Sequence, residues 1–190
     1  MPIISAKFGC NSMPAVVFNA DCDCCILLDF IRATAVKETE AFARERDASI
    51  RAHAANADAD LAALRQRADA APPADGDAGP TAEALEAVVA LRAEQAAALM
   101  AGIAAFRGLH DADFSSVDLV DAAGAPLKLF STPKTNAKTL LKHRATYTVV
   151  RNGRPPDRAT DGAPQPTDAA TEVVPLTFDI PADPQPTETA

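Results

Sequence analysis

The stretch PIISAKFGCNSMPAVVFN, residues 2–19, decides the fold. Two short runs of apolar, β-forming residues, 2–9 and 14–19, surround the turn-forming residues 9–12, GCNS. Runs of this kind on either side of a turn predict two strands that pair with each other. We therefore expect the chain to begin with a β-hairpin.

A helix is predicted directly after this hairpin. Asp21 or Asp23 can cap its first turn, where a carboxylate meets the positive end of the helix dipole. An apolar stripe at helical spacing follows, made of Ile26, Leu27, Phe30 and Ile31.

Residues 36–114 predict two further helical segments. Apolar residues recur every seven positions over the alanine-rich, charged residues 36–70, which is typical of a long helix with a narrow apolar seam. Residues 71–80 break this helix, Thr81 can cap a second one, and Gly108 suits its C-terminal end. We expect an antiparallel helical hairpin whose faces either pack only on each other or also dock on another protein.

The next region returns to strands. Residues 117–122 and 127–131 predict a second hairpin, and residues 134–142 predict a loop with a short helical turn. Residues 145–150, rich in β-formers, predict the last strand. Asn152 and Gly153 are then expected to turn the chain.

The order of these elements resembles the β-grasp roll of ubiquitin. The resemblance covers residues 1–35 and 115–153, and it implies that the first and last strands lie side by side under the helix. The fold class predicted is α+β, a ubiquitin-like β-grasp with residues 36–114 inserted as the helical hairpin and residues 154–190 as an extended, Pro/Thr/Asp-rich tail. No Gly-Gly follows the last strand, so an interaction domain is expected rather than a conjugated modifier.

One core is expected to join the strands and the first helix. Aromatic residues make up only 5% of the chain, so this core must be largely aliphatic. Its predicted members are Ile4, Phe18, Leu27, Ile31, Leu119, Leu129, Leu140 and Val149.

Residues 2–35 and 119–153 also resemble a family of small proteins of ciliated eukaryotes, named only as an X-chromosome open reading frame. Gly124, residues 127–130 (LKLF) and residues 146–147 (TY) carry this resemblance, and residues 173–178 (VVPLTF) look like a short tail motif of that family. It implies a non-catalytic structural or adaptor subunit of a ciliary or flagellar axonemal complex, such as a radial spoke, the central apparatus or a doublet-associated assembly. Its partners would be other axonemal proteins. The alternative is a soluble ubiquitin-like adaptor in signalling or proteostasis.

Charge and motifs exclude several classes of function. A net charge of −8 argues against a general nucleic-acid binder. We see no run of about 20 apolar residues and no signal peptide, so a cytoplasmic, reducing compartment is expected. The phosphate-binding and nucleophile-elbow motifs are missing. The sequence therefore predicts no enzyme, no cofactor and no small-molecule substrate.

The four cysteines are the most reactive residue type in the chain. Cys22, Cys24 and Cys25 lie where the first helix is expected to begin, and Cys10 lies in the first turn. Thiols at a helix N-terminus can be redox-active or bind metal, but zinc sites usually use two ligand pairs, and a second pair is missing here. Core packing is favoured, redox sensitivity stays open, and no metal site is predicted.

Two segments are predicted to dock on partners. Residues 115–153 carry six basic and two acidic side chains, a net +4, so Lys134, Lys138 and Arg144 can face either the acidic tail or an acidic partner.

The second docking segment, residues 172–180, is an apolar cluster within the polar tail. In an extended strand its alternating members would share one face, namely Val174, Leu176, Phe178 and Ile180. We expect this segment to add as a strand, or to lie in a groove, on a partner or on this chain's own sheet.

Overall fold

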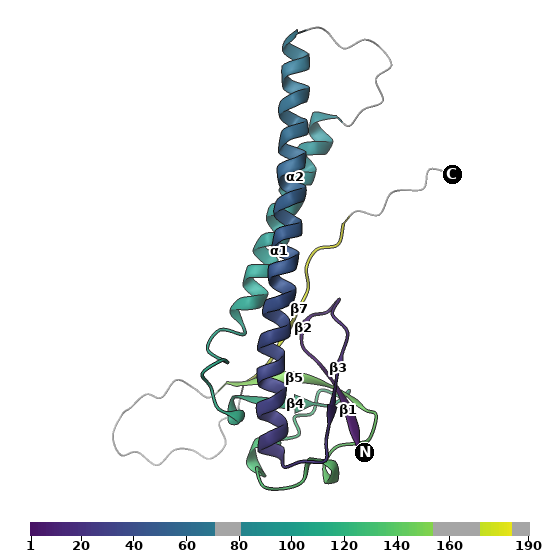
Figure 1. Cartoon of the computed structure of the whole chain (residues 1–190), viewed down its shortest axis with the longest axis vertical. Helices are drawn as coiled ribbons and strands as arrows, with labels where there is room; N and C mark the ends of the chain where they lie inside the picture. The colour runs from purple at the N-terminus through teal and green to yellow at the C-terminus, as the bar shows by residue number, and fades with distance from the viewer. Residues whose placement is uncertain (71–80, 154–171, 184–190) are drawn as a thin grey trace, which may run out of the picture. The chain divides into compact units, whose positions relative to one another are not determined.

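The computed structural model of the chain describes residues 1–70, 81–153 and 172–183 (Figure 1). The chain divides into two compact units. Unit 1 comprises Met1–Glu40 and Gly102–Phe178, and unit 2 comprises Ala41–Ala101 and Asp179–Ala190, each within the described ranges.

Two helices and a mixed sheet confirm the predicted α+β class. The helices are α1 (Cys24–Ala70) and α2 (Ala82–Ala104), and the 3-10 turns are η1 (Phe114–Ser116), η2 (Leu129–Ser131) and η3 (Ala137–Thr139). The strands are β1 (Ile3–Lys7), β2 (Gly9–Cys10), β3 (Val16–Asn19), β4 (Val117–Val120), β5 (Thr146–Gly153), β6 (Glu172–Pro175) and β7 (Thr177–Phe178).

The sheet of unit 1 has the strand order β3-β1-β5-β4. Strand β3 is antiparallel to β1, β1 is parallel to β5, and β4 is antiparallel to β5. The first hairpin, the strand near 117 and the last strand were therefore predicted correctly. The predicted N-terminal and last strands lie side by side in the middle of this order.

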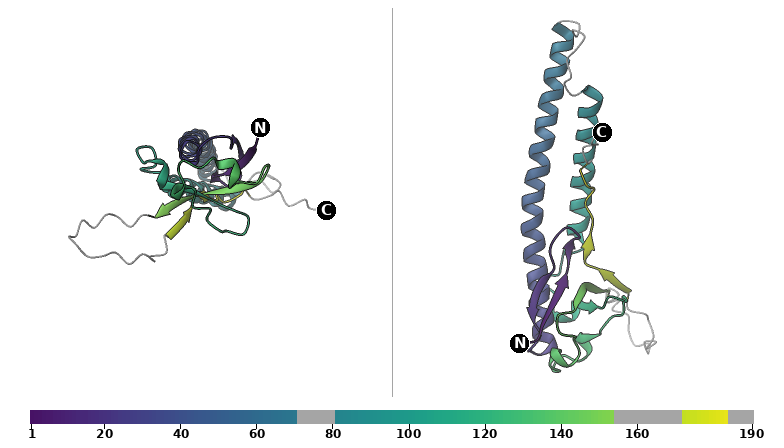
Figure 2. Two further views of the ribbon diagram at one scale, coloured as in Figure 1. Left: turned by 90° about the horizontal axis from the view of Figure 1, so that it is seen from below. Right: turned by 90° about the vertical axis from the view of Figure 1, so that its right-hand side faces the viewer.

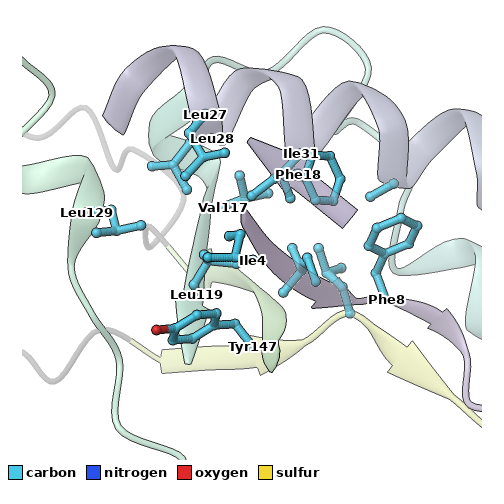
Figure 3. Close-up of a cluster of buried hydrophobic side chains, with 14 of the residues drawn as sticks. Ile4, Phe8, Phe18, Leu27, Leu28, Ile31, Val117, Leu119, Leu129 and Tyr147 are labelled. Carbon is cyan, nitrogen blue, oxygen red and sulfur yellow. The ribbon is translucent and has the colours of Figure 1, made fainter. Parts of the chain in front are cut away.

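The first turns of α1 cover one face of this sheet (Figure 3). Ile4 and Ala6 of β1 are buried while Ser5 between them is not, which is the two-residue period of a strand with one covered face. Leu27 and Ile31 of α1 pack into the same core cluster.

Seven of the eight predicted core residues belong to this cluster, and Leu140 does not. Leu140 is 44% exposed, and its neighbour Leu141 is buried instead. The amide of Leu141 donates to the carbonyl of Ala137 (2.9 Å) and thereby closes the turn that points Leu141 inward. The sequence pattern could not distinguish between these two adjacent leucines.

Replacing Leu27 with alanine is expected to lower the free energy of unfolding by about 2–5 kcal/mol, because its side chain is fully buried. Ile26→Ala is the matched control: Ile26 is 59% exposed, so its change should stay within about 0.5 kcal/mol. Urea unfolding measures both. Equal effects of the two variants would mean that the helix face is assigned wrongly.

The prediction of a second hairpin from residues 117–122 and 127–131 is wrong. Residues 127–131 form no strand: Val120 makes only a single bridge to Pro126, and the chain then enters η2. The cause is Asp118, whose carboxylate accepts the amide hydrogens of Lys128 (2.7 Å) and Leu129 (3.1 Å). These bonds satisfy backbone donors that a returning strand would have used in the sheet.

The turn predicted at residues 152–153 is also wrong. Strand β5 continues through Gly153, where it pairs with Glu172 of β6. Of the predicted tail, residues 154–171 and 184–190 lie outside the described residues, as does the loop at residues 71–80.

Unit 2 consists of the later part of α1, most of α2 and residues 179–183, and the two helices lie side by side (Figures 1 and 2). The predicted helix after the first hairpin and the predicted helix of residues 36–70 are one continuous helix, α1, which begins at Cys24. Its seven-residue repeat is buried at Ala43, Ile50 and Ala57, as the seam predicts. Leu85 of α2 packs against Ala57 and Leu61 of α1.

Polar contacts reinforce both helices of unit 2. Arg65 of α1 pairs with Glu86 of α2 at 3.0 Å. The predicted cap of α2 is confirmed, because the hydroxyl of Thr81 accepts the amide hydrogen of Ala84 at 3.2 Å.

Helix α2 is long and apolar enough to cross a membrane by length and composition alone. This criterion is weak support for a membrane span. Arg92 and the buried Gln95 lie near the middle of the helix, and polar or charged side chains are costly in a bilayer.

Candidate docking surfaces

Residues 172–178 of the predicted docking segment pair with strands of unit 1. Strand β6 pairs antiparallel with β5, and β7 pairs parallel with β2. Thr148 of β5 is paired on one edge by β1 and on the other by β4. Strand β4 pairs with one edge of β5 as far as Arg151. Strand β6 pairs with residues 150–153 of β5, so it must lie on the opposite edge, which β1 occupies only as far as Thr148. The tail therefore fits between β2 and β5, a position that we call the strand slot.

Leu176 is the centre of the strand slot. Its amide donates to the carbonyl of Val149 in β5 at 3.0 Å, and its carbonyl accepts the amide hydrogen of Gly9 in β2 at 2.8 Å. Its side chain is fully buried in the unit 1 core. Leu176 thus hydrogen-bonds through its backbone to both β2 and β5, and its side chain packs in the core of unit 1.

Phe178 is held against a glycine. A Cβ atom placed on Gly102 would lie 2.2 Å from Cγ of the Phe178 ring, so the ring occupies the space that any other residue at 102 would need. The carbonyl of Phe178 accepts the amide hydrogen of Asn11 at 2.8 Å. The sequence offered a signal for the apolar segment but none for this glycine partner.

The alternation predicted for the tail stops at Leu176. Val174 is 41% exposed although it lies two residues before the buried Leu176. The chain bends at Leu176, where its pairing changes from antiparallel with β5 to parallel with β2, so a single two-residue period does not extend over the segment. Ile180 is half-buried.

Within unit 2, residues 181 and 183 of the tail contact polar side chains of α2. The amide group of Gln95 donates to the carbonyl of Pro181 (2.8 Å) and to the carboxylate of Asp183 (3.0 Å). The guanidinium of Arg92 also binds this carboxylate. The hydrogen bond from Gln95, followed by that from Arg92, lowers the pKa of Asp183. The carboxylate of Asp183 in the acidic tail is therefore paired with the guanidinium of Arg92 on α2.

The predicted basic residues Lys134, Lys138 and Arg144 are all exposed in unit 1. Lys138 pairs with Asp21 at 2.7 Å, and this hydrogen bond lowers the pKa of Asp21. Arg144 has a left-handed backbone (φ 62°), and its amide donates to the carbonyl of Ile3 at 2.8 Å. We call segment 134–144, which carries these three exposed cations, the basic loop.

Two of the four thiols, those of Cys22 and Cys24, lie in surroundings that suppress their reactivity. Burial raises the pKa of both Cys22 and Cys24, and the side chain of Cys24 is fully enclosed. A thiol with a raised pKa has less of the nucleophilic thiolate at neutral pH. In the described part of the chain, no group of three or more His, Cys, Asp and Glu side chains is placed to hold a metal ion.

An exposed apolar pair on α1 was missed by sequence reasoning. Ile26 and Phe30 belong to the apolar stripe predicted on the first helix but are 59% and 62% exposed. The ring of Phe30 meets that of Phe18 edge-on at 5.8 Å, which places it beside β3, the edge strand of the sheet. The signal was present, because Leu28, Ile31 and Ala35 define a separate stripe at spacings of three and four.

Asp118 is the one fully buried carboxylate among the described residues, and its role is structural. Desolvation raises its pKa above the ordinary 3.8, against the opposing effect of its backbone hydrogen bonds. The folded chain therefore binds this proton more tightly than the unfolded chain does. The stability contributed by Asp118 is full below the unfolded pKa and is lost as the pH rises through the folded pKa.

We accordingly expect wild type to lose stability relative to Asp118→Asn as the pH is raised from about 4 to 7, because only wild type must ionise this buried group. Urea unfolding at several pH values measures the difference between the two proteins. A difference that stays constant with pH, or that changes in wild type's favour, would contradict the assignment.

Comparison of the chain with models of known protein families, with curated protein sequences and with solved structures finds no match.

Proposed function

We propose that this chain is a non-catalytic docking protein, a structural or adaptor subunit that acts by binding other proteins. The observation that carries the proposal is the exposed pair Ile26 and Phe30 beside the edge strand β3. Large apolar side chains grouped next to unpaired strand edges are typical of protein interaction sites. The pair offers apolar area, and the edge offers backbone hydrogen bonds to an added strand.

The framework for this docking is a ubiquitin-like β-grasp with an attached helical hairpin. The order β3-β1-β5-β4, with its parallel central pair, supports the β-grasp. The apolar seam between α1 and α2 and the pair formed by Arg65 and Glu86 support the hairpin. The raised thiol pKa values of Cys22 and Cys24 give no support to redox or metal chemistry.

The setting proposed is the axoneme of a cilium or flagellum, with other axonemal proteins as partners. This part of the proposal rests on the resemblance of residues 2–35 and 119–153 to the ciliary family. The basic loop, with Lys134, Lys138 and Arg144, offers a second contact that suits an acidic partner surface.

The test is retention in detergent-extracted axonemes of ciliated cells that express the tagged chain. Wild type should resist extraction by salt, whereas Ile26→Ser with Phe30→Ser should be released at least tenfold more, because both changes remove apolar contact area. Met100→Ser is the matched control and should be retained like wild type, since Met100 is 53% exposed but lies on α2 and not on the proposed docking surface.

The two parts of the proposal fail differently. Wild type found wholly in the detergent-soluble fraction would contradict the axonemal setting. If that soluble protein still sediments in a complex that the double variant loses, it acts as a soluble adaptor. Unchanged behaviour of the double variant in both fractions would contradict docking through Ile26 and Phe30.

A further inference from the structure

The connection between β5 and β6 is much longer than their pairing requires. Gly153 and Glu172 are direct partners in the ladder, a position that a two-residue turn can connect. The sequence places eighteen residues, 154–171, between them. A chain of that length can extend to about 60 Å. A connection of this length therefore does not force β6 and β7 to pair with the strands of the same copy of the chain.

The strand slot recognises the tail through the described residues of β6 and β7 themselves. The backbone of Leu176 bonds to Val149 and Gly9, its side chain fills the core, and the Phe178 ring packs on Gly102. A second copy of the chain presents an identical segment. Every one of these contacts can be made unchanged by the tail of another copy.

We propose that the tail strand is exchanged between two copies of this chain, so that Leu176 of each copy fills the strand slot of the other. Reciprocal exchange produces a closed dimer with two equivalent slots. The proposed occupant of each slot is the tail segment of the other copy, because the structure shows that this segment fits the slot. The proposal goes beyond docking through Ile26 and Phe30, because it uses a separate part of unit 1.

The length of the connection between β5 and β6 determines how often the tail strand is exchanged. The contacts are the same in both forms, so the balance depends on the effective concentration of the tail at its own slot, about 1 mM for a short flexible connection. Exchange should then rise in proportion to protein concentration below this value. It becomes dominant where an assembly holds two copies close together.

A disulfide between two differently tagged copies tests the exchange. One full-length copy carries Asn152→Cys and the other carries Val173→Cys, since these two positions are partners in the β5–β6 ladder. The copies are mixed at 0.1 and about 1 mM, incubated in mild denaturant so that tails can open, diluted, and oxidised. Copies with only the four native cysteines measure the background.

We expect a covalent heterodimer whose yield rises about fivefold between the two concentrations, because exchange approaches saturation at the effective concentration of about 1 mM. Leu176→Asp in the Val173→Cys copy should reduce it to background. Deleting residues 156–169 leaves a four-residue connection, which should lower the yield about tenfold by favouring the chain's own tail. A single copy with both new cysteines should close internally in every case, which verifies the register.

A heterodimer yield at background at the higher concentration, while the doubly substituted copy closes internally, would overturn the proposal. So would a yield that Leu176→Asp leaves unchanged, because the disulfide would then form without the slot. Neither result bears on the retention of Ile26 and Phe30 variants in axonemes, so the two proposals are tested independently.

Discussion

Replacing Leu176 with aspartate is expected to release the tail from unit 1 and to lower the free energy of unfolding by about 3–5 kcal/mol. The reason is that Leu176 is fully buried between β2 and β5, where a carboxylate would be desolvated without a partner. Urea unfolding measures the loss of stability, and limited proteolysis measures the release of the tail.

Val174→Asp is the matched control for this experiment. Val174 lies in β6, two residues before Leu176, but is 41% exposed, so its change should cost less than about 1 kcal/mol. If Leu176→Asp keeps wild-type stability and the same protection of the tail from protease, the tail is not a strand of unit 1.

The second large effect is expected at Gly102, and its sign depends on Phe178. In the wild-type background, Gly102→Ala should destabilise the chain by about 1–3 kcal/mol, because the added Cβ would lie 2.2 Å from the Phe178 ring and force it out. In a Phe178→Ala background the same change should stabilise by about 0.5–1 kcal/mol, since alanine is the better helix former.

A double-mutant cycle measures this reversal directly. The four proteins are wild type, the two single variants and the double variant, each unfolded in urea. A change at Gly102 that has the same sign and size in both backgrounds would contradict the packing of the Phe178 ring on α2.

Local pattern was sufficient for much of the fold. Ile4 and Phe18 could be placed in the core because the first hairpin alternates with the two-residue period of a half-buried strand. Ile50 and Ala57 could be placed on a buried seam because their spacing of seven matches two helical turns. Each of these inferences needed only residues that are close in the sequence.

The parts that sequence reasoning missed depend on contacts between distant residues. Residues 127–131 leave the sheet because Asp118 takes the amide hydrogens of Lys128 and Leu129, and a single aspartate in a strand pattern gives no sign of this. The tail segment stood out as an apolar cluster that needed a docking place. Its place, between Gly9 and Val149, could not be read from a local pattern.

Hydrogen exchange at two backbone amides tests the central claim, that the tail is a strand inserted between β2 and β5. The amide of Leu176 donates to Val149, and the amide of Gly9 donates to Leu176. In the full-length chain at neutral pH, both should exchange as slowly as the amides that pair β1 with β5, and both should become fast together in Leu176→Asp. If both exchange at the rate of an unstructured peptide in the wild-type chain while β1 and β5 remain protected, the tail is not inserted and the account is wrong.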